Sequence, residues 1–372
     1  MPQVDIEIKR IGRTGQGVGY DDAGNIYFVR GALPGDIVKV SYEQPHKRYR
    51  DADPVELLKP SSQRVDPCCP YFGICGGCDW LHWDYRAQLQ AKESMLAHAL
   101  ERANITATNL RPILGSPIIY GYRNRIQVRQ DGNRLGFYQK KSHRIVDVET
   151  CAVAHPALNQ KLAELRGQPP PTETSRKKLE LSLKPDGTVD LQENSPHASE
   201  GFCQINPLQN QALVRLVAEK VRSLHAGVVL ELYCGDGNLT FGYLPFIQQA
   251  LAIDSNEKSI SRALGLKLNR KLSNVEFCHA YIDPLLKDNL PQGFKNQYDT
   301  LMVDPPRDGM EGLIESFNHS RLKVIIYISC SPISFSRDFH RLEKLGFVLE
   351  EVQPIDMFPH THHIELLATM CR

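Results

Sequence analysis

Four short apolar runs in the last part of the chain constrain its fold most strongly. Helical patterns separate these runs, which span residues 228–232, 250–254, 300–304 and 324–328. Strands that are apolar throughout are buried on both faces, and this is typical of a parallel sheet covered by helices. Asn206 and Pro207 have the order of an N-cap and a first helical residue, so a helix is predicted before the first strand. The sequence therefore predicts a Rossmann-like α/β domain over 201–372.

The first 59 residues have a different pattern, in which strand-like runs alternate with turn residues. The runs at 4–8, 26–29 and 36–40 are separated by glycines and Pro34. Several short strands in so few residues indicate a small barrel of the OB kind, a fold that often binds nucleic acids. The loop at 47–50 (Lys-Arg-Tyr-Arg) adds basic charge. A barrel without any partner fits the same pattern, so this segment alone does not indicate a function.

Residues 60–200 are predicted to form a separate, β-rich central section. Leucine and methionine recur at helical spacing over 84–103, which predicts one helix there. Apolar and polar residues alternate over 125–129 and 179–183, which predicts two strands. Pro169–Pro171 and the Pro-Asp-Gly at 185–187 interrupt the pattern as turns.

The composition excludes several classes of protein. The 372 residues are 41% apolar and 23% charged, which is ordinary for a globular protein and argues against a collagen-like or disordered chain. The strongest apolar run, at 324–328, is far shorter than the ~20 residues of a membrane helix. Residues 1–9 alternate apolar and charged side chains, unlike the core of a signal peptide. We expect a cytoplasmic protein without a membrane partner or an obligate protein partner.

Positive charge gathers in one segment, although the net charge of the chain is only +1. Between residues 123 and 144, Asp131 is the sole acid among seven basic residues, namely Arg123, Arg125, Arg129, Arg134, Lys140, Lys141 and Arg144. Such a patch suits a polyanion such as RNA. A solvated face of a sheet would show the same charges, and the two interpretations are evenly balanced at this point.

Four of the ten cysteines fall between residues 68 and 78. In a cytoplasmic protein such a cluster indicates a metal site or catalysis more often than disulfides. The spacing Cys69-x5-Cys75-x2-Cys78 leaves a fourth ligand to be found, and Cys151 is the nearest candidate. Zinc accepts four cysteines but usually as two Cys-x2–4-Cys pairs, so the three-plus-one arrangement favours an iron–sulfur cluster. Cys68 is the spare thiol and could be confused with Cys69.

A cofactor loop is predicted after the strand at 228–232. Gly235 and Gly237 form a Gly-x-Gly turn there, and the next strand ends in Asp254, which can accept hydrogen bonds from ribose hydroxyls. The chain has no phosphate-binding Gly-Lys-Ser/Thr, and Phe241 stands where a dinucleotide fingerprint has its third glycine. The pattern thus favours S-adenosylmethionine over a dinucleotide, and an empty structural turn is the alternative.

Three further features lie where predicted strands begin or end. The segment 304–307 (Asp-Pro-Pro-Arg) is a stiff turn that presents carbonyls and one carboxylate to a planar base. Cys330 follows the strand at 324–328, where a thiolate could attack an electrophilic carbon, although free cysteines are usually inert packing. Glu365 opens a strand at 366–370, where burial would raise its pKa and suit it to act as a base. The histidines at 360–363 do not have the spacing of a metal site.

Taken together, these motifs resemble those of the S-adenosylmethionine-dependent RNA uracil-5-methyltransferases, which make 5-methyluridine in ribosomal and transfer RNA. The resemblance covers nearly the whole chain. Its sequence segments are 69–78 (Cys-Pro-Tyr-Phe-Gly-Ile-Cys-Gly-Gly-Cys) with Cys151, 202–206 (Phe-Cys-Gln-Ile-Asn), 233–238 (Tyr-Cys-Gly-Asp-Gly-Asn), Asp254, 304–307, Cys330 and Glu365.

The resemblance implies three domains: a TRAM barrel over 1–59, a central iron–sulfur domain over 60–200 and a class I methyltransferase domain over 201–372. It implies that Cys330 is the nucleophile and Glu365 the base. The implied contacts of S-adenosylmethionine are Gln204, Tyr233, Gly235, Gly237, Asn238, Asp254 and Asp304. The implied ligands of a [4Fe-4S] cluster are Cys69, Cys75, Cys78 and Cys151. The implied substrate is RNA, with 23S ribosomal RNA preferred and transfer RNA as the alternative.

The sequence departs from the family pattern at two positions. Ser331 replaces an asparagine whose amide could orient the base, and Tyr281 stands where some members have a cofactor-contacting Asn or Asp. Three other functions, two catalytic and one non-catalytic, are less well supported. An RNA cytosine-5-methyltransferase would have a second cysteine in the 304–307 loop, and an amino-methyltransferase would have an aromatic residue in place of Arg307. A non-catalytic iron–sulfur RNA-binding protein would have lost the glycines of the cofactor loop.

Overall fold

A computed structural model describes residues 1–42, 49–168, 176–194, 204–319 and 321–372, which form two compact units. The barrel unit comprises Met1–Met95, Ile118–Ser195 and Phe358–His363, and the sheet unit comprises Leu96–Pro117, Pro196–Met357 and Ile364–Arg372. The predictions for Lys47 and Arg48, for Pro169–Pro171 and for Phe202 and Cys203 lie outside the described residues. Among the described residues, no helix has the length and apolar character needed to cross a membrane.

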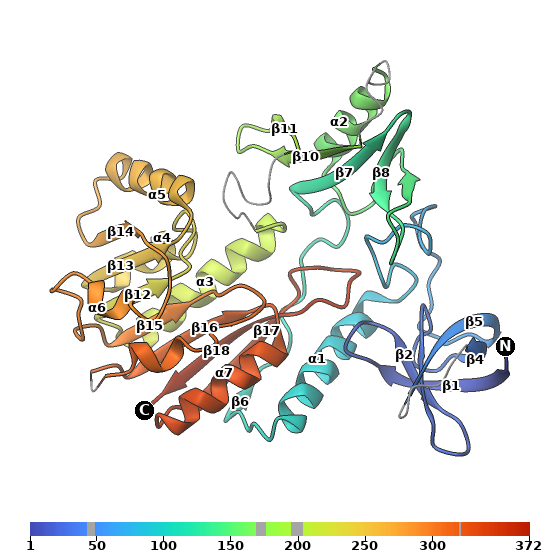
Figure 1. The fold of residues 1–372 in the computed structure, drawn as a ribbon, viewed down its shortest axis with the longest axis horizontal. Coiled ribbons are helices and arrows are strands. Elements are labelled where there is room, and N and C mark those ends of the chain that lie inside the picture. Colours follow the sequence, from blue (N-terminus) through green and yellow to red (C-terminus); the bar gives the residue numbers. More distant parts are fainter. Residues whose placement is uncertain (43–48, 169–175, 195–203, 320) are drawn as a thin grey trace. The chain divides into compact units, whose positions relative to one another are not determined.

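The barrel unit begins with a closed barrel of five strands in the order β1-β2-β3-β5-β4 (Figure 1). Its strands are β1 (Gln3–Ile11), β2 (Gly17–Tyr20), β3 (Ile26–Val29), β4 (Ile37–Tyr42) and β5 (Tyr49–Lys59). Alternate side chains of each strand face inward, so Ile6, Ile8, Val29 and Val40 are buried together. The barrel predicted from the first 59 residues is therefore confirmed.

The same unit contains a second sheet, with strand order β11-β10-β7-β8-β9. Its strands are β7 (Arg125–Asp131), β8 (Arg134–Tyr138), β9 (Ile145–Asp147), β10 (Lys177–Leu183) and β11 (Val189–Glu193). The two strands predicted in this section, β7 and β10, pair with each other. Helix α2 (Pro156–Arg166) was not predicted; it packs Leu158 and Leu162 into the core of this sheet. Pro156 at its first position was the available signal.

Helix α1 (Tyr85–Arg102) confirms the helix predicted over 84–103. Its first half packs Ala87, Ala91 and Met95 near Trp80 and Trp83 in the barrel unit. Its second half contributes Leu96 and Leu100 to the core of the sheet unit. The chain passes from one unit to the other within this single helix.

The sheet unit is built on eight strands in the order β14-β13-β12-β15-β16-β18-β17-β6. They are β6 (Asn109–Leu110), β12 (Val228–Leu232), β13 (Gln249–Asp254), β14 (Val275–His279), β15 (Thr300–Val303), β16 (Val324–Ser329), β17 (Val348–Ile355) and β18 (Glu365–Cys371). The strands from β14 to β16 are parallel, but β18 runs antiparallel to both β16 and β17. The parallel arrangement predicted for the four apolar runs, which are β12, β13, β15 and β16, is confirmed. The antiparallel strand β18, whose direction was not predicted, makes the sheet a mixed one.

The helices of the sheet unit follow the predicted alternation with strands (Figure 1). They are α3 (Pro207–Ser223), α4 (Thr240–Tyr243), α5 (Glu257–Asn269), α6 (Leu286–Asn289) and α7 (Pro332–Lys344), with short 3-10 turns at Leu244–Phe246 and Ile314–Phe317. As predicted, Asn206 caps α3, because its side chain accepts a hydrogen bond from the backbone N–H of Gln209.

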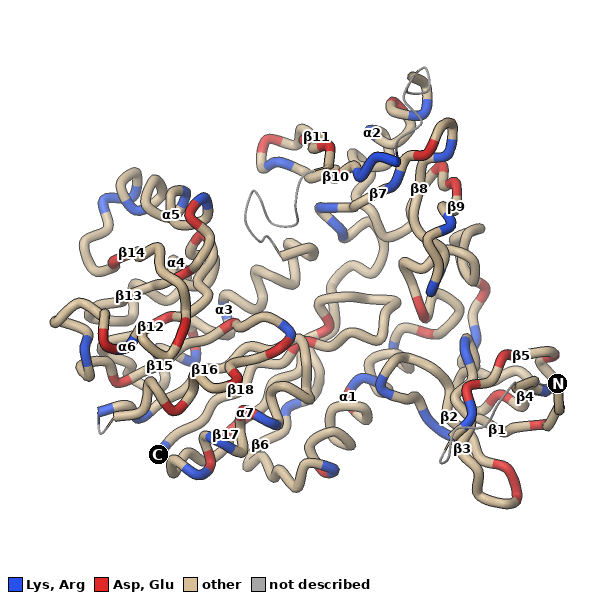
Figure 2. The backbone as a smooth tube through the Cα atoms, viewed as in Figure 1, with Lys and Arg blue, Asp and Glu red and all other residues tan. Residues whose placement is uncertain are grey.

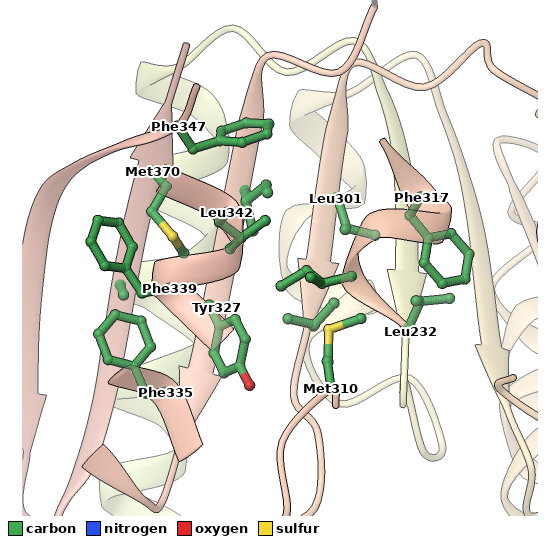
Figure 3. Close-up of a cluster of buried hydrophobic side chains, with 14 of the residues drawn as sticks. Leu232, Leu301, Met310, Phe317, Tyr327, Phe335, Phe339, Leu342, Phe347 and Met370 are labelled. Carbon is green, nitrogen blue, oxygen red and sulfur yellow. The ribbon is translucent and has the colours of Figure 1, made fainter. Parts of the chain in front are cut away.

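Aromatic side chains of α7 pack against β16 and β18 in the core of the sheet unit (Figure 3). Within this core, the buried carboxylate of Asp338 accepts hydrogen bonds from the Tyr327 hydroxyl at 2.7 Å and from the Met310 backbone N–H at 2.6 Å. Met310 lies just beyond the 304–307 turn. The core therefore fixes the far end of the loop that contains Asp304 and Arg307.

Candidate active site and thiol pocket

The predicted cofactor loop follows β12 and contains three residues in the left-handed backbone conformation. Tyr233, Gly235 and Gly237 all have positive φ angles, of 65°, 57° and 85°. A Cβ atom at Gly237 would lie 2.7 Å from the Phe241 ring, so this position requires glycine. A Cβ at Gly235 would meet no atom within 4 Å. The loop is therefore tightly packed against Phe241 at Gly237. At Gly235 it leaves open space, where a ligand could approach the backbone.

Asp254 stands at the end of β13, beside this loop. Its Oδ2 accepts a hydrogen bond from the Gly235 N–H at 2.8 Å, and its Oδ1 accepts one from the Asn256 N–H at 2.8 Å. Each carboxylate oxygen can accept a second hydrogen bond. The side chain thus fixes the loop and keeps acceptor sites for the hydroxyls of a ribose.

Asn238 is held by a residue that sequence reasoning missed. The amide of Asn210 on α3 donates to Asn238 Oδ1 at 2.8 Å, and the amide of Asn238 donates to Asn210 Oδ1 at 2.9 Å. Gln204 is buried just before α3. This reciprocal pair ties the cofactor loop to the helix that follows Gln204, a long-range contact that no local pattern reveals.

Glu231 on β12 is a second missed residue. It is buried, and its Oε2 accepts hydrogen bonds from the hydroxyls of Thr240 and Tyr243, both at 2.6 Å. Burial raises the pKa of Glu231 to about 7, although the two hydroxyls lower it. The Glu231 side chain therefore links β12, which precedes the cofactor loop, to α4, which follows it.

The structure brings the predicted nucleophile and base together at one edge of the sheet. In the antiparallel register of β16 and β18, Ser329 lies opposite Leu366. Continued by one residue, this register places Cys330 opposite Glu365, and directly opposed side chains have Cβ atoms about 4.5–5.5 Å apart. Asp304 follows β15, the neighbour of β16 on its other side. The three side chains thus meet at the ends of three adjacent strands.

Burial dominates the electrostatics of these groups. It raises the pKa of the Cys330 thiol to about 11, with Glu365 raising it further and Arg307 lowering it. It also raises the pKa of Asp304 to about 7 and that of Glu365 well above its usual range. Asp304 adds to the rise at Glu365, and Arg307 opposes it. The raised pKa predicted for Glu365 from its position is therefore confirmed.

The two departures from the family pattern have different surroundings. Ser331 caps α7, since its Oγ accepts a hydrogen bond from the Ser334 N–H at 3.3 Å. Its backbone carbonyl accepts hydrogen bonds from the hydroxyls of Ser329 and Ser334. Ser331 thus fixes the backbone next to Cys330. The Tyr281 side chain is 78% exposed beyond the end of β14.

Four thiols line one pocket of the barrel unit, and they are those of Cys69, Cys75, Cys78 and Cys151. Cys68 is exposed and is not part of the lining. Asn159 of α2 fixes Cys151, because its side chain accepts from the Cys151 N–H at 2.8 Å and donates to the Cys151 carbonyl at 3.1 Å. Burial raises the pKa of the Cys78 thiol to about 12 and also raises the pKa values of Cys69 and Cys75.

These thiols do not form a site for a single metal ion. Across the described ranges, no three His, Cys, Asp or Glu side chains lie close enough together to hold one metal ion. His362 instead pairs with Asp79, with Nδ1 and Oδ2 2.6 Å apart. The iron–sulfur cluster expected from the sequence therefore stays a prediction.

The basic residues of the 123–144 segment lie along β7 and β8 and in the loops next to them (Figure 2), and their side chains have different surroundings. Arg123 lines the thiol pocket, Arg125 approaches Glu180, and Lys140 pairs with Asp79. The exposed basic side chains of the segment are those of Arg134, Lys140, Lys141 and Arg144. The sequence could not reveal this division, because it depends on the direction of each side chain.

Comparisons with known proteins agree with this architecture. A family model described as tRNA (Uracil-5-)-methyltransferase matches residues 192–370, and the TRAM domain model matches residues 3–55. An uncharacterized RNA methyltransferase of Nitrosomonas europaea is 32% identical over 98% of this chain and 95% of its own length. A 23S rRNA (uracil(1939)-C(5))-methyltransferase of Acinetobacter baumannii is 28% identical over 99% of this chain and 95% of its own length.

A solved structure shows the same fold. It is that of the tRNA (uracil-54, C5)-methyltransferase of Pyrococcus abyssi in complex with S-adenosyl-L-homocysteine. The two chains superpose with a TM-score of 0.73 at 23% identity, over 99% of this chain and all of the other.

Proposed function

Since the chain belongs to the family of S-adenosylmethionine-dependent RNA uracil-5-methyltransferases, we propose that it methylates C5 of a uridine through a covalent adduct with Cys330. The observation that carries this proposal is the register of β16 and β18, which sets Cys330 opposite Glu365. A nucleophile and a base on directly opposed positions can act on adjacent carbons of one ring.

Cys330 begins the reaction, because C5 of uracil is a poor nucleophile by itself. The Cys330 thiolate attacks C6, and the electron pair of the C5–C6 double bond moves into an enolate over C5, C4 and O4. C5 then takes the methyl group from the sulfonium, and S-adenosylhomocysteine leaves. The reacting carbons must be held within about 3–3.5 Å of each other for this transfer.

Glu365 completes the reaction. It accepts the proton from C5, the electrons of the C5–H bond restore the C5–C6 double bond, and the bond from Cys330 to C6 breaks. Its raised pKa makes the ionised carboxylate a stronger base than an ordinary glutamate. The nearby Asp304 increases this basicity, because two adjacent carboxylates resist ionising together.

The methyl donor is assigned to the open side of the cofactor loop. Asp254 accepts the ribose hydroxyls, and the loop backbone at Gly235 and Gly237 lies close to the ligand. Asn238, positioned by Asn210, supplies a further polar contact. The remaining contacts proposed are those of Gln204, Tyr233 and Asp304.

The preferred substrate is 23S ribosomal RNA, with transfer RNA as the alternative. The full-length similarity to a 23S rRNA methyltransferase supports the first, and the description of the matching family model supports the second. We assign RNA contacts to the barrel (1–59) and to exposed cations of the central section (60–200), such as Lys141 and Arg144. The methyltransferase domain (201–372) performs the chemistry.

We propose that the four pocket thiols hold a [4Fe-4S] cluster instead of one ion. They line a common pocket, and no three of them form a site for a single metal ion. In a cluster each iron takes its own cysteine, so the thiolates stand further apart than around a single ion. Cys69, Cys75, Cys78 and Cys151 would hold this group, which would join the loop at 69–78 to the segment before α2 without redox chemistry in the methylation.

Radiolabelled S-adenosylmethionine and separate ribosomal and transfer RNA transcripts test the proposal. We expect label in 5-methyluridine after nucleoside analysis, with ribosomal RNA the better substrate. Label in 5-methylcytidine would reject the uracil assignment. Label confined to transfer RNA would replace the preferred substrate by the alternative.

A further inference from the structure

Among the described residues, Arg123 is the one cation that lines the thiol pocket. Its backbone is fixed by a hydrogen bond from its N–H to the Val153 carbonyl at 2.9 Å. Its Nε donates to the Tyr122 hydroxyl at 3.3 Å, and its Nη2 reaches the Gly77 carbonyl at 3.5 Å. The guanidinium therefore lies between the Tyr122 ring and the loop that contains Cys75 and Cys78.

No acidic side chain of the described residues pairs with Arg123. Other arginines of the barrel unit do have carboxylate partners: Arg166 pairs with Asp147 and Arg176 with Asp131. The two contacts of Arg123 use two of its five N–H donors, and both are long. A partly buried guanidinium without a counter-charge is costly. A negative charge that balances the Arg123 guanidinium must therefore come from a group bound in the pocket.

The described side chains that line the pocket do not supply a carboxylate. They include four cysteines and Arg123 but no Asp or Glu. A group held by four thiolates is negatively charged, and it would supply the missing partner for the guanidinium.

We infer that Arg123 is the internal counter-charge of the thiolate-held cluster and donates N–H hydrogen bonds to its sulfur atoms. This inference rests on the cluster of the proposed function. It removes Arg123 from the RNA-binding residues and makes it a positioning residue for the cofactor. Hydrogen bonds to sulfur and local charge set the reduction potential of such clusters. A cation favours the reduced form, which is the more negative one, so Arg123 should raise the potential and retain the iron.

The test uses the full chain, reconstituted without oxygen, and compares the wild type with Arg123→Gln and Arg123→Lys. Arg134→Gln is the matched control, because Arg134 is exposed on the same sheet. Iron and sulfide content, the rate of iron loss to a chelator, and the midpoint potential are measured. Circular dichroism checks that each variant is folded.

For Arg123→Gln we expect a tenfold shift of the redox equilibrium toward the oxidised form, which is a potential lower by about 59 mV. Iron should also be lost at least fivefold faster. Arg123→Lys keeps the charge without the planar fork, and its equilibrium should shift at least threefold. Arg134→Gln should match the wild type. If Arg123→Gln does not fold, Arg123→Lys decides the question.

Shifts below twofold in the folded Arg123 variants would overturn the role of Arg123 and leave the cluster in place. A wild-type chain that takes up no iron would remove both the cluster and this role. The transfer of labelled methyl groups to RNA distinguishes that case from a failure of the proposed reaction, because it depends on Cys330 in the sheet unit.

Discussion

The chain uses cysteine in two settings that differ in the charge around the sulfur. Burial raises the thiol pKa in both. At Cys330 the nearest ionisable groups include two carboxyls, and Arg307 opposes them. In the thiol pocket, the charged neighbours that raise the pKa of Cys78 are other thiols instead of carboxyls, and Arg123 lowers it. We propose two uses for these settings: Cys330 attacks the base of the RNA, whereas the pocket thiols would hold the proposed cluster.

The largest loss of activity is expected when Cys330, the proposed nucleophile, is replaced. Cys330→Ala should reduce methyl transfer to RNA roughly 10⁴-fold or more, as expected when a covalent nucleophile is lost. Cys371→Ala is the control, because Cys371 lies at the other end of β18. Label transfer from S-adenosylmethionine measures both variants. A Cys330→Ala protein with wild-type turnover would remove the covalent step.

Glu365→Gln should separate the two halves of the reaction. The amide cannot accept the C5 proton, so turnover should fall roughly 10²–10⁴-fold while the methylated adduct accumulates. Denaturing gels should show protein attached to labelled RNA. Slow turnover without any attached RNA would refute the role of Glu365 as the base.

The charge next to Cys330 can be changed without touching the sulfur. Arg307 lowers the pKa of Cys330, so Arg307→Gln should raise that pKa above about 11. Only the thiolate is alkylated, and the pH profile of Cys330 alkylation should therefore move to higher pH. Peptide mass spectrometry follows this one residue. Lys323→Gln, at the opposite end of β16, should leave the profile unchanged, and an unmoved profile in Arg307→Gln would show that the guanidinium does not act on the thiol.

A smaller effect is expected from the support of the cofactor loop. Asn210→Ala removes two hydrogen bonds to Asn238, each worth about 1 kcal/mol. The dissociation constant of S-adenosylmethionine should rise by up to about 30-fold, which corresponds to about 2 kcal/mol. Calorimetry can measure it, with Gln211→Ala, exposed on the same helix, as the control. Equal affinities for the two variants would mean that Asn210 does not position the loop.

The smallest effect concerns the residue after Cys330. Ser331→Ala removes the cap of α7 and should lower the free energy of unfolding by about 1 kcal/mol. Ser331→Asn should preserve it, since asparagine is an equally good cap. Chemical denaturation measures both. If alanine and asparagine behave alike, the capping role is wrong.

Much of the sheet unit could be predicted, because its central strands are short apolar runs. Strand β14 was missed because Glu276 and His279 interrupt its apolar pattern at the edge of the sheet. The sequence also placed Cys330 and Glu365 at strand ends. That Cys330 and Glu365 lie opposite each other could not be predicted, because it depends on the antiparallel pairing of β18 with β16.

The rest of the site depends on side-chain directions that local patterns do not contain. The Asn210 and Asn238 amides are 28 positions apart in the chain and meet only in the fold. Arg123 was grouped with its basic neighbours, yet its side chain turns toward the thiols. Spacing indicated three of the four cysteines and left Cys151 as a candidate, whereas the position of Arg123 beside them required coordinates.

The most direct test of the central claim is to trap the bond between Cys330 and C6 of the base. An RNA substrate with 5-fluorouridine at the target site has no proton at C5 for Glu365 to remove, so the adduct should persist after methyl transfer. We predict a stable complex whose digestion yields the Cys330 peptide attached to a methylated fluorouracil nucleotide, and no complex with Cys330→Ala. Attachment at another cysteine, or methylation without any attachment, would contradict the account.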